Sequence, residues 1–302
     1  MRRSPNLLLT LAAVIVLGGA GLLAKGVIGG DGAAATFLTG DPAAATASPS
    51  PTGPSPEELA RIARAKKVKA LDAALKKYAA TVPEFSVAVL DKKTGESYAY
   101  RGDEHYETAS VVKVQVLACL LLTAQDGGRK LTSLEDTRAG KMIRLSDNQS
   151  TTELFKSLGG RSGIQKCDKR MGLTSTTVNN AWGLTRTTVS DQVKLLAQLV
   201  SDDSPLSERA RDYAHKLMST VDSQQRWGVP AAARSGEQFT VKNGWLPRST
   251  ENGLWIVNSV GRITGDDVDV SIAVLSHGHK TQQAGEAVIE KVVRTTRTLL
   301  QY

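Results

Sequence analysis

The chain has 302 residues, 41% of them hydrophobic and 23% charged, with a formal net charge of +8. Its four histidines are too few and too scattered for a metal cluster, and neither a metal nor another cofactor is expected. A basic balance is typical of proteins that bind nucleic acid, but the export signal described next argues against that partner and favours a mildly basic surface beside anionic envelope polymers.

The N-terminus predicts export. Arg2 and Arg3 precede an apolar run from Leu7 to Ala24, which is the layout of a basic region followed by a hydrophobic one. The run is about 18 residues long, near the lower limit for spanning a bilayer. Residues 1–25 are therefore expected to be a signal peptide or a signal anchor. No cysteine ends the run, so a bacterial lipid anchor is not expected.

By the positive-inside rule, the basic end stays in the cytoplasm and everything after the run is exported. The sequence thus predicts an extracytoplasmic location, either secreted or anchored through residues 7–24 to the outer face of the cytoplasmic membrane. Residues 26–54 are mostly Gly, Ala, Ser, Thr and Pro, which predicts a disordered linker. Residues 55–302 are the expected folded domain, and we expect it to be a monomer.

The secondary structure of this domain can be predicted in chain order. A capping box with proline at the first helical position starts a helix at Ser55-Pro56-Glu57-Glu58. Short strands are expected at 85–90 and 96–100, joined by a hairpin turn, and residues 110–200 are expected to be largely helical. Three further strands (239–242, 254–263 and 268–275) and a last helix (281–300) complete the domain. The fold class is therefore α+β, with an antiparallel sheet built from both chain ends, flanking helices and a helical subdomain.

The two cysteines, Cys119 and Cys167, would be able to pair in an oxidising compartment. Cys119, however, lies in a strongly apolar predicted helix, where a buried free thiol is equally consistent. The sequence leaves the disulfide open.

The first chemical signal is Ser110-Val111-Val112-Lys113. The helix predicted over 111–122 is apolar on every face except at Lys113 and Gln115, so it belongs in the core. A lysine there must be paired, hydrogen-bonded or deprotonated, because an isolated buried ammonium is very costly. Ser110 and Lys113 share one helix face, and a desolvated lysine with a lowered pKa can take the serine proton. We therefore predict Ser110 as nucleophile and Lys113 as its base.

Two further triplets follow, Ser146-Asp147-Asn148 and Lys242-Asn243-Gly244. Taken alone, the first is an ordinary helix cap and the second a hairpin turn. In this order after Ser-x-x-Lys, they resemble the S-x-x-K, S-D-N and K-T-G motifs of class A β-lactamases and penicillin-binding proteins. The resemblance covers nearly all of residues 55–302, and that family shares the predicted α+β plan.

The resemblance implies roles for the second triplet. Ser146 would relay a proton to the leaving nitrogen, Asn148 would hydrogen-bond the substrate amide carbonyl, and Asp147 would mainly brace the turn.

For the third triplet, the resemblance implies that Lys242 attracts the substrate carboxylate and that Gly244 leaves room for the substrate. The N–H of Trp245 would form the oxyanion hole with that of Ser110. Asn243 would also contact substrate, but it stands where the family has Thr or Ser and so removes a hydroxyl that binds the carboxylate. Whether an arginine (Arg226 or Arg248) helps to bind that carboxylate stays open.

One departure concerns deacylation. Class A β-lactamases carry a glutamate between the second and third motifs that activates the deacylating water. The corresponding residues here, 173–189, contain no acid. Glu107 and Glu153 lie near motifs in sequence, but neither has the expected position, and both are interpreted as surface or helix-end charges.

Three functional hypotheses follow. The preferred one is an exported serine hydrolase of β-lactamase type that forms an acyl-enzyme on Ser110 with a β-lactam or related amide. The second is a D-Ala-D-Ala peptidase or transpeptidase that acts on peptidoglycan stem peptides. The third is a penicillin- or wall-binding module with degenerate catalysis.

Overall fold

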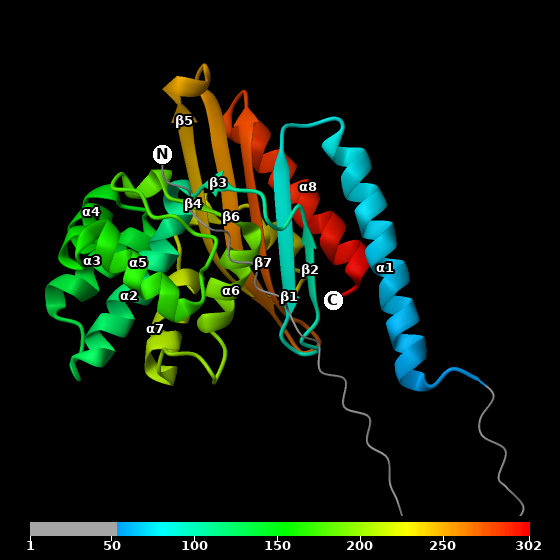
Figure 1. The fold of residues 1–302 in the computed structure, drawn as a ribbon, viewed down its shortest axis with the longest axis horizontal. Coiled ribbons are helices and arrows are strands. Elements are labelled where there is room, and N and C mark those ends of the chain that lie inside the picture. Colours follow the sequence, from blue (N-terminus) through cyan, green and yellow to red (C-terminus); the bar gives the residue numbers. More distant parts are fainter. Residues whose placement is uncertain (1–52) are drawn as a thin grey trace, which may run out of the picture. The chain divides into compact units, whose positions relative to one another are not determined.

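A computed structural model describes residues 53–302, and the predicted export signal and nearly all of the predicted linker lie outside the described residues. The order of the elements is shown in Figure 1. They are α1 (Pro56–Ala79), β1 (Phe85–Asp91), β2 (Ser97–Tyr100), β3 (Tyr106–Glu107), the 3-10 turn η1 (Ala109–Val111), α2 (Val112–Asp126), α3 (Ser133–Arg144), α4 (Asn148–Ser157), α5 (Gly160–Met171), η2 (Trp182–Leu184), β4 (Arg186–Thr187), α6 (Val189–Gln198), α7 (Glu208–Ser219), η3 (Ser223–Gln225), η4 (Val229–Ala232), β5 (Gln238–Arg248), η5 (Ser249–Glu251), β6 (Leu254–Thr264), β7 (Asp269–His279) and α8 (Gln282–Leu300).

The main sheet has five antiparallel strands in the order β2-β1-β7-β6-β5, so strands from both chain ends lie side by side. The long helix α8 packs on β6 and β7, and α1 packs on α8. The helices α2 to α5 and α7 form a subdomain beside β5, and α6 packs on β1, β6 and β7 (Figure 1). This arrangement confirms the predicted α+β fold class.

The strand expected over 268–275 runs on to His279, and two boundaries near the motifs also differ from the prediction. The strand expected over 239–242 runs on to Arg248, because Lys242, Asn243 and Gly244 continue the ladder with β6 instead of turning. The helix expected from residue 111 is preceded by η1, so Ser110 lies in a tight 3-10 turn just before α2.

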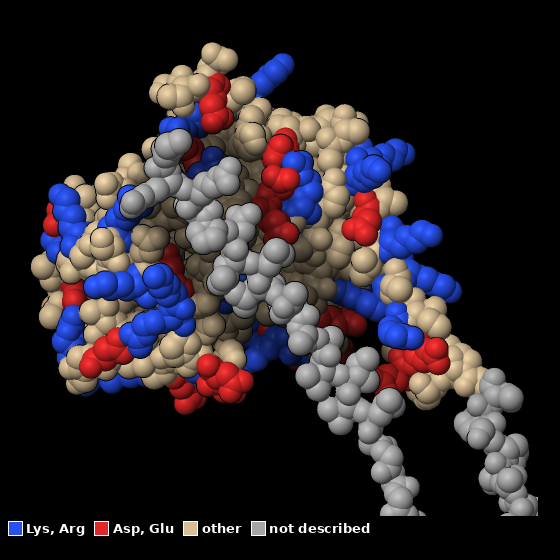
Figure 2. All heavy atoms as spheres, in the orientation of Figure 1, with Lys and Arg blue, Asp and Glu red and all other residues tan. Residues whose placement is uncertain are grey.

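Helix α2 is the centre of the core. Residues Ala109–Asp126 are the one stretch of the described chain that is long and apolar enough to cross a membrane, yet 78% of that stretch is buried in the domain. A helix that is apolar on all sides is stable in water only when other parts of the protein surround it. On the surface, Figure 2 shows Lys and Arg mixed with Asp and Glu over α1 and the helical subdomain.

A disulfide joins Cys119 in α2 to Cys167 in α5, across 48 residues of sequence. Both cysteines are buried. The bond therefore ties the helix that follows Ser110 to its neighbour in the helical subdomain, and it answers the question that the sequence left open.

Replacing both cysteines with alanine is expected to lower the free energy of unfolding by about 4 kcal/mol, because the unfolded chain regains the freedom of the closed loop. Urea unfolding followed by circular dichroism measures this. The wild-type protein in reducing buffer should lose a similar amount. A loss below about 1 kcal/mol in both would show that the bond contributes little to stability.

Candidate active site

The turn η1 presents Ser110 against strand β5. Ala109 has φ +46°, a left-handed conformation that strains a residue with a side chain. A Cβ on Gly244 would lie 2.7 Å from Ser110 N, 2.8 Å from Val111 N and 2.9 Å from Thr108 O. The β5 backbone thus rests directly on the turn, and only glycine permits this approach.

Lys113 is fully buried one turn later, and its amine is surrounded by acceptors. Its Nζ donates to Ser146 O (2.6 Å), Ser146 Oγ (3.0 Å) and Asn148 Oδ1 (2.8 Å). Burial lowers the pKa of Lys113 to about 7, against an opposing effect of the nearby Asp147 carboxylate. A large share of Lys113 is therefore a neutral amine near neutral pH, as the sequence predicted for a base.

Ser146 stands between two lysines. Its Oγ accepts from Lys113 Nζ and from Lys242 Nζ, each at 3.0 Å. Its backbone is left-handed, with φ +56°, which turns the chain just before α4. The structure thus brings Ser146 to the same place as Lys113, although 33 residues separate them in sequence.

Asp147 caps α4 by accepting from Ser150 N at 2.7 Å. Its side-chain and backbone contacts with Ser150 hold the pKa of Asp147 below its usual value. The ordinary helix-cap interpretation of this triplet is therefore correct for Asp147, while its two neighbours face Lys113. Asn148 is exposed apart from its contact with that lysine.

Lys242 points from β5 to the same serine. Its Nζ donates to Ser146 Oγ (3.0 Å), Gln225 Oε1 (3.4 Å) and Asn243 O (2.8 Å). Burial, together with the charge of Lys113, lowers the pKa of Lys242 well below its usual value. The amines of Lys113 and Lys242 both have a lowered pKa and both contact the Ser146 hydroxyl. A proton can therefore move between them through that hydroxyl.

Asn243 lies in the same strand, but its side chain is engaged with the backbone. Its Nδ2 donates to Gln225 O (2.8 Å) and Trp227 O (3.1 Å), and the side chain is buried. Asn243 therefore ties the segment after η3 to β5. Trp245, two residues on, is half-buried with its ring 6.0 Å from that of Trp227.

The loop over residues 173–189 offers an aromatic ring to Lys113. The Trp182 ring centroid lies 5.1 Å from Lys113 Nζ, and Trp182 Nε1 donates to Thr152 Oγ1 at 3.2 Å. An aromatic face attracts the protonated form of a lysine amine. The side chain of this loop that lies nearest to Lys113 in the described contacts is therefore the Trp182 indole.

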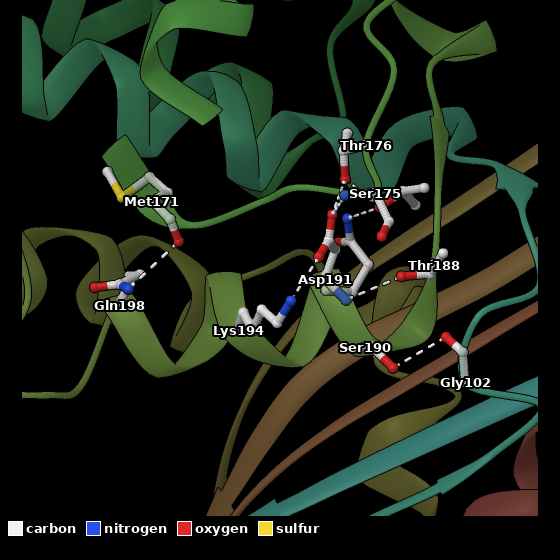
Figure 3. Close-up of polar contacts among 11 residues, drawn as sticks. Gly102, Met171, Ser175, Thr176, Thr188, Ser190, Asp191, Lys194 and Gln198 are labelled. Atoms are coloured by element: carbon white, nitrogen blue, oxygen red, sulfur yellow. Dashed lines mark hydrogen bonds and ion pairs between the residues drawn. The ribbon is translucent and has the colours of Figure 1, made fainter. Parts of the chain in front are cut away.

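The carboxylate that holds this loop comes from the next helix. Asp191 of α6 is fully buried, and its Oδ2 accepts from Ser175 N and Thr176 Oγ1, each at 2.8 Å (Figure 3). Lys194 contacts its other oxygen at 3.1 Å. With its oxygens satisfied in this way, Asp191 anchors the start of the loop.

The acids near the motifs are engaged in ion pairs. Glu107 pairs with Arg248 through Nε–Oε2 (2.7 Å) and Nη2–Oε1 (3.1 Å), and both side chains are about four-fifths buried. Glu153 contacts Arg138 at 3.6 Å. Glu153 lies in the middle of α4 with a partly exposed side chain, so the surface interpretation suits it and the helix-end one does not, whereas Glu107 is a partly buried partner that the sequence prediction did not foresee.

Three residues at the site were missed from the sequence. They are Trp182 over Lys113, Gln225 beside Lys242, and Asn258, whose Nδ2 donates to Glu107 O (2.9 Å) and Thr108 O (3.0 Å). Asn258 in β6 pairs with Gly244 in β5, and this register places Asn258 next to η1. The sequence signal that could have indicated it is the polar pair Asn258-Ser259 between apolar residues of β6.

Comparisons with known proteins identify the family and the fold. The sequence model of the family described as "Beta-lactamase enzyme family" matches residues 64–138 and 132–302. A protein of Mycobacterium tuberculosis named "Putative lipoprotein LppW" is 26% identical over 218 residues, which are 70% of this chain and 68% of that protein.

Solved structures share the fold. An ancestral class A β-lactamase (GNCA) is 21% identical with a TM-score of 0.66, covering 76% of this chain and 99% of that one. The protein PBP-A is 18% identical with a TM-score of 0.67, covering 77% and 96%. At these identities, the likeness speaks for the fold alone.

Proposed function

This chain belongs to the beta-lactamase enzyme family, and on that basis we propose that it is a serine hydrolase that forms an acyl-enzyme on Ser110. The observation that carries the proposal is the environment of Lys113, a buried amine with a pKa of about 7 one turn after the serine. β-Lactams and related amides are the proposed acyl donors.

In the proposed acylation, Ser110 Oγ attacks the carbonyl carbon and its proton passes to neutral Lys113. Ser110 Oγ makes no hydrogen bond within residues 53–302, and such contacts commonly form only when substrate arrives. The backbone N–H groups of Ser110 and Trp245 would hold the oxyanion. When the C–N bond breaks, the leaving nitrogen takes the Ser146 Oγ proton, which Lys113 replaces across 3.0 Å.

Deacylation has weaker support. Residues 173–189 contain no carboxylate, and the side chain that they place near the Lys113 amine is the Trp182 ring, at 5.1 Å. We therefore expect the acyl-enzyme to persist. This favours, as a second candidate, a D-Ala-D-Ala peptidase or transpeptidase acting on peptidoglycan stem peptides, in which an amine can replace water as acceptor. If the acyl-enzyme were not released at all, the protein would be a penicillin-binding module with degenerate catalysis, which is the third candidate.

An exported location fits this chemistry. The mycobacterial relative is named a lipoprotein, and the disulfide of this chain is suited to an oxidising compartment. Both cysteines of the sequence are joined to each other. Any membrane attachment of this chain is therefore proposed to use the apolar run 7–24.

The test is the intact mass of the protein mixed with benzylpenicillin and sampled over time. We expect an adduct on Ser110 that is absent in Ser110→Ala and that decays slowly. Rapid decay with multiple turnover would favour an efficient β-lactamase, and cleavage of a D-Ala-D-Ala peptide would favour the peptidase. An unmodified mass with every β-lactam tried would refute the acyl-enzyme.

A further inference from the structure

No other part of the described chain covers one face of helix α1. Val68, Leu71 and Leu75 are wholly or partly buried on the face toward the domain, where α1 packs on α8. The residues that follow each other at spacings of three and four on the opposite face are all exposed: Leu59, Ile62, Lys66, Lys69, Ala73 and Lys76. Residues at these spacings lie side by side on a helix, so they form one continuous surface, which we call the outer face.

Two large aliphatic side chains lie on the outer face. Leu59 is 53% exposed and Ile62 is 42% exposed, and they are two of the four large hydrophobic side chains that are exposed in the described chain. Residues 56–63 are all exposed, and the first buried residue of α1 is Leu71, so this end of the helix extends past the domain core. Apolar side chains that gather on an exposed surface indicate a contact site.

The rest of the outer face is basic. Helix α1 carries seven lysines and arginines against three acids, a net charge of +4, which is half of the +8 of the whole chain. Figure 2 shows Lys and Arg side chains along the outer edge of this helix. Within residues 53–302, the ion pairs of α1 are made by Arg61 and Arg64, which leaves the lysines of the outer face without an acidic partner there.

The acids of α1 are engaged elsewhere. Glu57 and Glu58 lie in the first turn, where Glu58 contacts Arg61 at 3.8 Å. Asp72 accepts a hydrogen bond from Tyr98 OH at 2.7 Å, on the side of the domain. The outer face beyond the first turn therefore attracts an anionic surface.

The combination of aliphatic and basic side chains favours a lipid surface as the partner. Lysines alone suit any polyanion, but a polyanion offers nothing to Leu59 and Ile62. An anionic bilayer accepts both kinds of group, because its headgroups attract the amines and its acyl boundary takes the aliphatic side chains. Helix α5 provides the contrast, since it has the exposed pair Lys166 and Lys169 at the same spacing but no exposed large hydrophobic side chain.

The sequence before α1 brings such a surface within reach. The apolar run predicted as a signal or anchor ends at Ala24, and α1 begins at Pro56. A flexible chain of this length has an average end-to-end distance of about 30 Å. Used as an anchor, the run would hold α1 close to the bilayer, so that even a weak contact of the outer face is populated.

We propose that the outer face of α1 lies on the outer surface of an anionic membrane, with its lysines among the headgroups and Leu59 and Ile62 at the acyl boundary. The inference goes beyond the proposed acyl-enzyme and does not depend on it; it rests on the proposed export, with the anchor as tether. Helix α1 packs on α8 and β2, whereas η1, which carries Ser110, packs on β5 at the opposite edge of the sheet. Contact through α1 therefore keeps Ser110 at the edge farther from the lipid.

Amide hydrogen exchange of residues 56–66 tests the contact. The full chain is reconstituted into vesicles of phosphatidylcholine alone, or with about 30% phosphatidylglycerol, and exchange is followed by mass spectrometry. These amides lie in an exposed helix end, which opens easily in the absence of a partner. We expect them to exchange at least about tenfold more slowly on the anionic vesicles than on the neutral ones. Equal exchange on the two kinds of vesicle overturns the inference.

Glutamine variants identify the side chains responsible, because glutamine keeps a good helix propensity. The double variants Leu59→Gln/Ile62→Gln and Lys66→Gln/Lys69→Gln should each lose most of the tenfold difference between the vesicles. The neutral vesicles serve as the reference for each variant and correct for any change in helix stability. A full difference retained in Leu59→Gln/Ile62→Gln would leave only a site for polyanions and overturn the lipid contact.

The matched control is Lys166→Gln/Lys169→Gln, which removes the same charge at the same spacing from α5. It should keep the full difference in exchange of residues 56–66. A loss as large as that in Lys66→Gln/Lys69→Gln would show a general attraction between charges and overturn the assignment to α1.

Other occupants of the outer face give other results. Slow exchange already on neutral vesicles would mean that the apolar run of this chain or a second copy covers the face. Equal slowing by soluble polyglutamate added to neutral vesicles would assign the face to an anionic polymer. Either result overturns the lipid contact. Failure of the anchor is distinct, since a chain that does not sediment with neutral vesicles lacks it, while the comparison of exchange with and without anionic lipid still decides the inference.

Discussion

Lys113→Met is expected to slow acylation of Ser110 by about 10²–10⁴-fold, the usual effect of losing a positioned proton acceptor. Methionine has nearly the length of lysine and suits a fully buried position in an apolar helix. The amine, by contrast, is kept in that position at a desolvation cost, which its lowered pKa reflects. The fold should therefore survive while the base is lost. Intact-mass kinetics with a β-lactam measure the effect.

The same base predicts the pH dependence of the wild-type reaction. Since the pKa of Lys113 is about 7, acylation should fall about tenfold per unit below pH 7, as the amine becomes protonated, and should level off above it. Burial also raises the pKa of Asp168 to about 7, but this carboxyl contacts Gln115 and not Lys113. Asp168→Asn should therefore keep the profile, and Lys169→Met, at an exposed position, should keep the rate. A profile that is flat from pH 5 to 8 would exclude Lys113 as the base.

Sequence patterns predicted the parts of the site that local chemistry determines. Lys113 is recognisable because it is a charged residue in an otherwise apolar helix. A buried lysine is stable there only if its amine is paired, hydrogen-bonded or uncharged. Ser146 and Lys242 were found only through their order along the chain, and the structure brings them together, with Ser146 Oγ 3.0 Å from both the Lys113 and the Lys242 amines. The sheet was predictable because its strands alternate with clear turn signals.

Long-range pairing explains what was missed. The Glu107–Arg248 pair spans 141 residues, and nothing in either local sequence indicates that the two side chains meet. Trp182 stands in a loop whose composition suggests only polar irregular chain, so its contact with Lys113 depends on how Asp191 anchors that loop. Asn243 was expected to face substrate, whereas the strand register directs its amide to the Gln225 and Trp227 carbonyls.

These contacts separate the two halves of the reaction. The groups proposed for acylation are Ser110 in η1, Lys113 in α2 and Ser146 in the left-handed turn before α4. The loop that would supply water activation instead contributes Trp182. A change in the core should therefore alter formation of the acyl-enzyme, while a change in the loop should alter its lifetime.

Gly244→Ala is a second core change with a large expected effect. The added methyl group would lie 2.7–2.9 Å from three backbone atoms of residues 108, 110 and 111, none of which can rotate away as a side chain could. Strand β5 must therefore move from η1, which separates the Trp245 N–H from Ser110 and Lys242 from Ser146. A displacement of about 1 Å at a reacting centre can cost 10²-fold in rate. We expect acylation to fall at least that far, with a loss of about 1–3 kcal/mol in the free energy of unfolding.

A control separates this steric effect from that of an added methyl group in general. Gly140 lies in helix α3, where a methyl group added to its Cα would have no neighbouring atom within 4 Å. Gly140→Ala should therefore keep full acylation and gain a little stability from helix propensity. If Gly244→Ala acylates as fast as Gly140→Ala, the close contact between β5 and η1 is not needed for catalysis. If both stability and acylation fall in Gly244→Ala alone, that contact is what aligns the oxyanion donors with the nucleophile.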